Sequence, residues 1–256
     1  LVAGILVSLL CGALSTFVVL RRMAFIGVGI SHSAFGGVAL GFLLGVDPLW
    51  TGIAFALMVA LLLEYAQTRT SVEEDTAIGI FFAASMALGL VFLHLSRAYN
   101  VDVFGFLFGN ILAIDTRQLW QILVVTVGVL AVLLAFFKEL VFLSFDEEMA
   151  WVSGVPVKPL RYLFLVLMAL VVIVTIYLVG IILVSALLVI PGAIAQNLAR
   201  QLKTMVWVST GVAVGSAVGG LILSYSIDFP SGATIVLVLT LLYLLTSGLR
   251  SWWLST

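Results

Sequence analysis

The chain has 256 residues, of which 64% are hydrophobic and only 9% are charged, and its formal net charge is −1. A soluble domain carries about 25% charged residues, so a chain this apolar cannot cover itself with polar surface, and its solvent is predicted to be lipid. The charge balance argues against nucleic acid as a partner, because nucleic-acid binding needs a basic face. The single cysteine, Cys11, cannot form a disulfide within the chain.

Eight runs without acidic or basic residues follow one another along the chain, and a bilayer core needs about 20 apolar residues of helix. They are Leu1–Leu20, Met23–Val46, Pro48–Leu63, Thr76–Ser96, Gln118–Phe137, Tyr162–Ala199, Thr204–Ile227 and Phe229–Leu249. Tyr162–Ala199 has 38 residues, enough for two spans, and the other seven runs have the length of one. A further short run, Val103–Ile114, cannot cross upright and is expected to be re-entrant or broken.

Positive charges orient the C-terminal half, because cytoplasmic loops of membrane proteins carry an excess of Lys and Arg. If the polar loop Lys138–Arg161 is cytoplasmic, two passes of the 38-residue run bring Arg200, Lys203 and Arg250 to the same side. A turn is therefore predicted near Val179-Gly180, and the C-terminus is predicted to be cytoplasmic.

The sequence thus predicts an all-α, polytopic transmembrane bundle of about eight to nine spans, forming a single domain over residues 1–256. The orientation of the N-terminal half depends on Val103–Ile114. If that run is re-entrant, Arg21, Arg22 and Arg69 lie inside, and if it spans, most of these positions reverse. Counting charges favours the re-entrant arrangement.

Two glycine ladders repeat a small residue at every fourth position, which lets membrane helices approach closely. One ladder is Gly37, Gly41 and Gly45, and the other is Gly211, Gly215 and Gly219. Both are predicted to be packing seams between helices. They imply a compact bundle and do not identify a function.

Two histidines lie within predicted spans, where ionisable groups are costly and often functional. His94 is near the end of its run and is expected to reach the interface. His32 lies about 14 Å along a helix from Met23, close to the midplane. Spacing alone leaves two interpretations of His32 open. A neighbouring helix could satisfy the imidazole, or the imidazole could bind a zinc- or manganese-class ion on a permeation path.

No enzyme signature is found in the sequence. The lysines Lys138, Lys158 and Lys203 do not follow a glycine in a P-loop pattern, and HExxH and zinc-finger spacings do not occur. The chain is therefore not expected to be an enzyme. If ATP drives it, the ATPase is a separate chain.

The polar segment after the fifth run can form a short capped helix. Asp146 suits the N-cap, with Glu147 and Glu148 in the first turn, and Gly154 followed by Pro156 can end the helix. Such a helix outside the bilayer is either a docking point for a soluble partner or a solvated connection.

Six segments in order resemble the zinc/manganese/iron permease family of bacterial ABC transporters, over essentially the whole chain. They are Arg21–Gly27 with Ser31-His32, Glu74–Ile80, Leu107–Ile114, Phe145–Val157, Val179–Ala195 and Asp228–Leu237. The resemblance implies a fold related to type II ABC importer permeases and a function in ATP-driven import of zinc or manganese.

The family implies two permease copies, two cytoplasmic ABC ATPase subunits and an extracytoplasmic metal-binding protein, in the bacterial cytoplasmic (inner) membrane. The metal ion is the substrate, and no tightly bound cofactor is expected. Residues 145–157 look like the cytoplasmic coupling helix. Its predicted ATPase-coupling residues are Asp146, Glu147, Ala150, Gly154, Val155 and Pro156. Pro191 lies in the segment that resembles a gate and removes a helix hydrogen bond, so it is a predicted hinge.

The family commonly has an aspartate four residues before the histidine, where this chain has Val28. The resemblance makes His32 a metal ligand. For the missing carboxylate three explanations stay open: a ligand comes from elsewhere, the ion is held weakly, or the substrate differs. The candidate substitutes are Asp47, Glu74, Asp75 and Asp228. Two rival functions remain. One is a permease for a metal chelate or siderophore, and the other is a secondary transporter driven by an ion gradient. A membrane scaffold without transport is a third, which leaves the capped segment unexplained.

Overall fold

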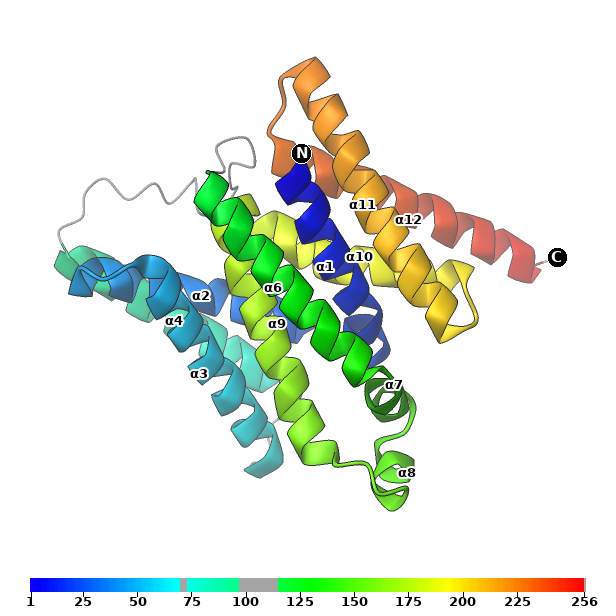
Figure 1. Ribbon diagram of the computed structural model, residues 1–256, viewed down its shortest axis with the longest axis horizontal. Coiled ribbons are helices and arrows are strands. Elements are labelled where there is room, and N and C mark those ends of the chain that lie inside the picture. Colours follow the sequence, from blue (N-terminus) through cyan, green and yellow to red (C-terminus); the bar gives the residue numbers. More distant parts are fainter. Residues whose placement is uncertain (70–72, 97–114, 256) are drawn as a thin grey trace.

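The computed structural model describes residues 1–69, 73–96 and 115–255, which are helical almost throughout (Figure 1). The helices are α1 Val2–Leu20, α2 Ala24–Leu44, α3 Pro48–Arg69, α4 Glu74–Ser96, α6 Thr116–Ala135, α7 Phe137–Phe145, α8 Glu147–Val152, α9 Val157–Val179, α10 Ile181–Leu198, α11 Leu202–Ile227 and α12 Ser231–Ser255. Within these residues, nine helices are long and apolar enough to cross a membrane. The prediction of an all-α, multi-pass membrane bundle is confirmed.

The 38-residue run forms two helices, as predicted. Gly180 separates α9 from α10 with φ of +83°, a backbone conformation that glycine adopts without steric cost. The turn itself is buried, since Val179 and Ile181 expose 1% and 2% of their surface. The expected re-entrant run Val103–Ile114 lies outside the described residues.

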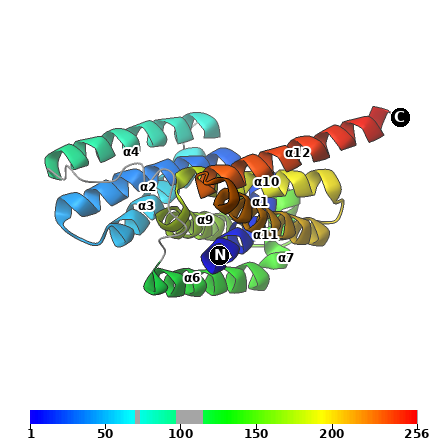
Figure 2. The same ribbon diagram turned by 90° about the horizontal axis from the view of Figure 1, so that it is seen from above.

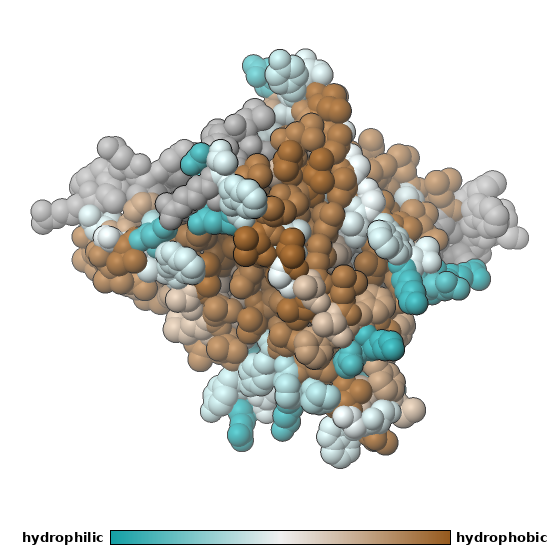
Figure 3. Space-filling view, in the orientation of Figure 1, coloured by the Kyte–Doolittle hydropathy of each residue, from teal (hydrophilic) through white to brown (hydrophobic). Residues whose placement is uncertain are grey.

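The most buried spanning helices are α1, α2 and α9, and α4 and α12 lie along one edge of the bundle, with α6 along the opposite edge (Figure 2). Phe17 of α1 is buried and packs edge-to-face against Phe137 and Phe164, with ring centroids 5.9 and 6.4 Å away. Apolar side chains cover the middle of the surface, and polar side chains gather at the lower edge, where α3 ends and α9 begins (Figure 3). One end of the bundle is therefore polar and its flanks are suited to lipid.

The first glycine ladder lies in the contact between α2 and α3. A Cβ on Gly37 would come within 2.6 Å of the Phe55 Cβ and 2.8 Å of the Gly52 Cα, and one on Gly41 would collide with Thr51. Both glycines are thus required for close packing of the two helices. Gly45 has a different role, since its φ of +65° ends α2 in the left-handed conformation and a Cβ there would meet nothing within 4 Å.

The second glycine ladder does not pack within this chain, which corrects the prediction for it. A Cβ on Gly211, Gly215 or Gly219 would meet nothing within 4 Å. The packed face of α11 instead carries Ser209, Ala213, Ser216, Ala217, Gly220 and Ser224. This face of α11 packs because α1 provides space and a hydrogen-bond acceptor for it. Gly12 of α1 admits the Cβ of Ala213, and its carbonyl accepts a 2.7 Å hydrogen bond from the Ser209 hydroxyl.

Candidate functional site

His32 lies in the middle of α2 and is partly buried. Its Nδ1 is 2.9 Å from the carbonyl oxygen of Val28, one turn earlier, and its ring meets the Phe82 ring edge-on at 4.8 Å. A carbonyl can only accept, so Nδ1 donates this hydrogen bond, and the neutral tautomer that makes it has its lone pair on Nε2. Metal-binding histidines commonly have this arrangement, with one nitrogen donating to a carbonyl and the other left for the ion.

Hydroxyl groups from α2 and α10 meet at Ser31, the residue before His32. Ser31 is fully buried and donates to the carbonyl of Gly27 at 2.6 Å. The Ser185 hydroxyl of α10 lies 3.5 Å from that of Ser31 and donates to the carbonyl of Ile181. The sequence did not indicate Ser185, because it lies 154 residues from Ser31 in an apolar segment. Ser31 of α2 thus faces α10, whereas the His32 ring meets Phe82 of α4.

Within the described part of the chain, His32 does not belong to a cluster of metal-ligating side chains. Among the described residues, no group of three or more His, Cys, Asp or Glu side chains could hold a metal ion. Asp47 accepts a 2.9 Å hydrogen bond from the Leu49 N–H at the start of α3, and Asp228 ends α11 with φ of +53°. These two carboxylates therefore serve helix ends. Val28 is partly exposed, like His32, and offers only its carbonyl.

The segment 145–157 contains the predicted capped helix, which is α8. The Asp146 carboxylate accepts a 2.9 Å hydrogen bond from the Met149 N–H, and Gly154 ends the segment with φ of +82°. The Val155 N–H then donates to the carbonyl of Ala150 at 3.0 Å. Asp146 as N-cap and Gly154 as terminator are both confirmed as local structure.

One side of α8 is anchored and the other is exposed. Ala150 is fully buried in a small apolar cluster with Leu143, Val157 and Leu160. The exposed side of α8 and the last residue of α7 carry large apolar residues outside the long spans. They are Phe145, Met149, Trp151 and Val152, which expose 67%, 56%, 73% and 73% of their surface. An exposed apolar patch on a rigid polar end is typical of a docking surface.

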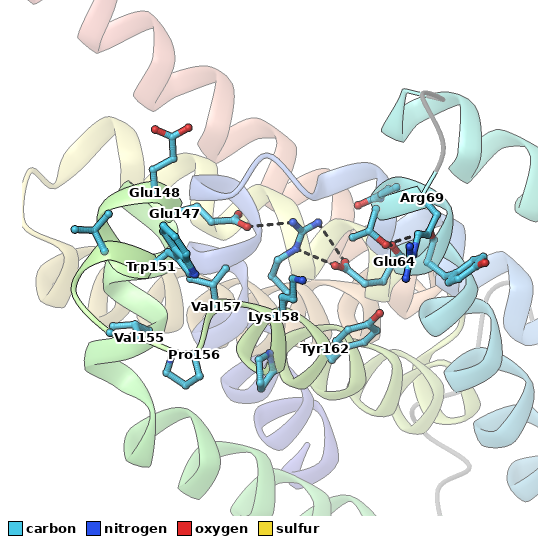
Figure 4. A pocket seen from close by; sticks show the side chains of 17 residues that line it. Glu64, Arg69, Glu147, Glu148, Trp151, Val155, Pro156, Val157, Lys158 and Tyr162 are labelled. Atoms are coloured by element: carbon cyan, nitrogen blue, oxygen red, sulfur yellow. Dashed lines mark hydrogen bonds and ion pairs between the residues drawn. The ribbon is translucent and has the colours of Figure 1, made fainter.

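An open cavity of about 1270 Å³ lies beside α8, between the end of α3 and the start of α9 (Figure 4). Gly154, Val155 and Pro156 form part of its wall, together with charged side chains from all three helices. The structure thus brings the predicted coupling residues together at one end of the molecule, except that Ala150 is turned inward.

A network of charged residues that the sequence did not reveal joins the three helices around this cavity. Arg161 Nε lies 3.0 Å from Oε1 of Glu64, and its Nη1 lies 3.1 Å from Oε1 of Glu147 (Figure 4). Glu64 is 2% exposed, so Arg161 neutralises a buried carboxylate. Glu64 and Arg161 are 97 residues apart. From the sequence alone, Glu64 was expected to be a charged residue at the end of a span, close to water.

Pro191 lies inside α10 and is buried. The next residue, Gly192, donates its N–H to the Ser15 hydroxyl of α1 at 2.7 Å, and a Cβ on Gly192 would collide with the Ser15 backbone. Because proline has no N–H, one hydrogen bond within α10 is missing beside the close contact between Gly192 and Ser15 of α1. The hinge role of Pro191 stays a prediction.

The comparisons with known proteins agree on one class of membrane protein. The model of the ABC 3 transport family matches residues 1–250. The chain is 38% identical over 245 residues to the manganese transport system membrane protein MntC of Halalkalibacterium halodurans, covering 96% of this chain and 84% of the relative. It is 35% identical over 246 residues to the high-affinity zinc uptake system membrane protein ZnuB of Haemophilus influenzae, covering 96% and 94%.

Solved structures point the same way. PsaBC from Streptococcus pneumoniae, in complex with Fab, superposes with a TM-score of 0.86 at 36% identity, covering 96% of this chain and 88% of that one. An inward-facing, putative metal-chelate type ABC transporter superposes with a TM-score of 0.76 at 19% identity, covering 95% and 84%, and shows a shared fold. The chain belongs to the ABC 3 transport family of metal-ion ABC transporter permeases.

Proposed function

We propose that this chain is the membrane-spanning permease subunit of an ATP-driven importer that brings zinc or manganese into the cytoplasm. The relatives named above include a manganese and a zinc transport protein. The observation that carries the proposal is His32, an imidazole in the middle of a span with Nδ1 bound to its own helix and Nε2 left for a ligand. A single imidazole holds a cation weakly, which suits a conduction path that the ion must also leave.

The proposed complex contains two copies of this chain, two cytoplasmic ABC ATPase subunits and an extracytoplasmic metal-binding protein. The exposed side of α8 offers Met149, Trp151 and Val152 to the ATPase. Asp146 and Gly154 fix the two ends of α8, so that a push on this surface moves the segment as a unit. ATP hydrolysis is assigned to the separate ATPase chain.

The end of the molecule that carries α8 is assigned to the cytoplasm, and the C-terminus with it. Arg21, Arg22 and Arg161 line one small cavity at this end, and Lys138 and Lys203 line another. Gathering these cations on one side satisfies the positive-inside rule. The proposed location is the bacterial cytoplasmic membrane.

The test is metal uptake by the reconstituted complex of permease, ATPase and binding protein. The wild-type complex is expected to take up zinc or manganese only with ATP, and His32→Ala is expected to abolish uptake while the complex still assembles. His94 is the matched control, because it is exposed near the end of α4 and His94→Ala should leave uptake unchanged. Full uptake by His32→Ala would remove this residue from the mechanism.

A permease for a metal chelate is the second candidate function. Val28, which offers no carboxylate next to His32, favours it, and so does the fold shared with a putative metal-chelate type transporter. The same reconstituted complex separates the two functions. ATP-dependent uptake of a ferric chelate, with no uptake of free zinc or manganese, would favour this alternative.

A further inference from the structure

Arg161 lies between two carboxylates, those of Glu64 and Glu147. Its Nε and Nη2 lie 3.0 and 3.4 Å from the two carboxylate oxygens of Glu64, and its Nη1 lies 3.1 Å from Oε1 of Glu147. One guanidinium thus bridges α3, through Glu64, and α8, through Glu147, from its own place on α9. A planar guanidinium suits this task because it presents several donors in a fixed fork.

The two ends of this bridge differ in burial, which sets how the bridge responds to a movement of α8. Glu64 is 2% exposed and Glu147 is 45% exposed. A buried carboxylate is strongly destabilised when its partner is removed, whereas an exposed one is solvated by water. Arg161 will therefore stay with Glu64, and any force that α8 exerts through Glu147 is passed to α3.

Helix α3 carries this force to the histidine segment. Glu64 is the last member of the buried stripe of α3, which also includes Gly52, Phe55 and Ala56. Gly52 and Phe55 of this stripe meet Gly37 of α2, and Thr51 of α3 meets Gly41, at distances that leave no room for a Cβ. Helices packed this closely move together. Since His32 lies on α2 as well, a shift of α3 reaches the imidazole.

We propose that Arg161 is a positioning residue that couples α8 to α3, and through the glycine seam of α2 to His32, during the transport cycle. The inference rests on the proposed function and adds to it the route by which movement of the coupling segment reaches the metal ligand. Arg161 contacts neither nucleotide nor metal in this role. It acts through Glu64 and Glu147.

Three variants separate a relay from a packing role. Arg161→Lys keeps a cation beside the buried Glu64, but one ammonium cannot bridge both carboxylates as the guanidinium does. Glu147→Gln breaks only the arm to α8. Glu148→Gln is the matched control, because Glu148 is the neighbouring exposed carboxylate and makes none of the ion pairs with Arg161.

The measurement is the number of metal ions taken up per ATP hydrolysed, in proteoliposomes with the ATPase, the binding protein, and zinc or manganese. Arg161→Lys and Glu147→Gln are each expected to lower this ratio about fivefold or more, and Glu148→Gln is expected to leave it unchanged. The double variant Arg161→Lys/Glu147→Gln should be no worse than either single variant, because both break the same connection. A wild-type ratio in Arg161→Lys, or additive losses in the double variant, would overturn the inference.

A charge-free variant keeps the test valid if the single variants fold poorly. Glu64→Leu/Arg161→Met removes both charges together, so no buried charge is left without a partner. It is expected to co-purify with the ATPase and to show the same loss of coupling. Wild-type coupling would show that the pair is not needed for coupling, and loss of ATPase binding would show that the pair only maintains the docking surface. Either result would overturn the inference. If the wild-type complex takes up neither metal with ATP, the proposed function itself fails, and the relay falls with it.

Discussion

The imidazole of His32 is oriented by its own helix. The hydrogen bond from Nδ1 to the carbonyl of Val28, one helical turn earlier, holds the imidazole against its own helix. The Phe82 ring limits rotation of the imidazole. A second ligand at position 28 would therefore approach the ion from the same helix face. Position 28 is therefore the place on α2 where a second ligand can be introduced next to His32.

Replacing Val28 by Asp tests the orientation of this face. A carboxylate in the middle of a span is costly unless it faces a polar path. If residues 28 and 32 face the path, Val28→Asp will fold and retain more zinc or manganese after purification, measured by mass spectrometry of bound metal. Transport need not become faster, because a tighter site releases its ion more slowly. Ile26 is fully buried, so Ile26→Asp is the control that should lose folded protein. If Val28→Asp loses folded protein to the same extent, residue 28 lies off the path.

Gly154 is the second residue whose backbone decides its function. At φ of +82°, a β-branched side chain is strained, by about 1–2 kcal/mol. Gly154→Val is therefore expected to loosen the end of α8 and lower metal uptake, although a Cβ there meets no neighbour within 4 Å. Asparagine tolerates this conformation, so Gly154→Asn should retain most of the uptake. Equal uptake by the Val and Asn variants would show that the backbone at this residue is unimportant.

Whether a glycine ladder forms a packing seam depends on which face of its helix the neighbouring helix contacts. Glycines spaced by four residues line up on one helix face in both α2 and α11, yet only Gly37 and Gly41 of α2 meet another helix closely. In α11, contact with α1 and α12 uses Ala213 and Gly220 instead. The face that packs is set by the three-dimensional arrangement, because a period of four residues is the same on a buried and an exposed face.

Gly41→Leu and Gly215→Leu form a matched pair that tests this difference. Leucine at 41 would push α2 and α3 apart, and overpacking of this kind costs about 1–3 kcal/mol or more. Leucine at 215 enters open space. We expect Gly41→Leu to reduce the yield of folded protein in detergent and Gly215→Leu to purify like the wild type, by size-exclusion chromatography. A loss for Gly215→Leu would show that a second chain covers this face of α11.

For the molecule as a whole, the sequence predicted the spans and the capped segment better than the site. Runs of apolar residues locate spans because lipid demands them, and Asp146 and Gly154 define α8 by local rules. The Glu64–Arg161 pair and the Ser185–Ser31 contact could not be foreseen, because each joins residues about a hundred or more positions apart. The resemblance pointed to His32. The hydrogen bond from its Nδ1 to the carbonyl of Val28 appears only in the structure.

Assembly with the ATPase is expected to depend on the aromatic residue at the exposed side of α8. Trp151 is 73% exposed, and aromatic residues commonly contribute most to an interface. Trp151→Ala should weaken ATPase binding about tenfold or more, which corresponds to the loss of an interface hot spot. Trp50, at the opposite end of α3 and 63% exposed, is the control. Binding of labelled ATPase to the permease in nanodiscs measures both, and equal affinities would place the docking surface elsewhere.

The shortness of α8 has a consequence for inhibitor design. Six residues are too few for a helix to persist in water, since isolated helices need about 12–15 residues even in favourable sequences. In the folded chain, Ala150 is clamped by Leu143, Val157 and Leu160, which hold α8 in shape. A synthetic peptide copying residues 145–157 would have to pay the full ordering entropy on binding. We therefore expect such a peptide to compete poorly for the ATPase, and a version cross-linked into a helix to compete far better.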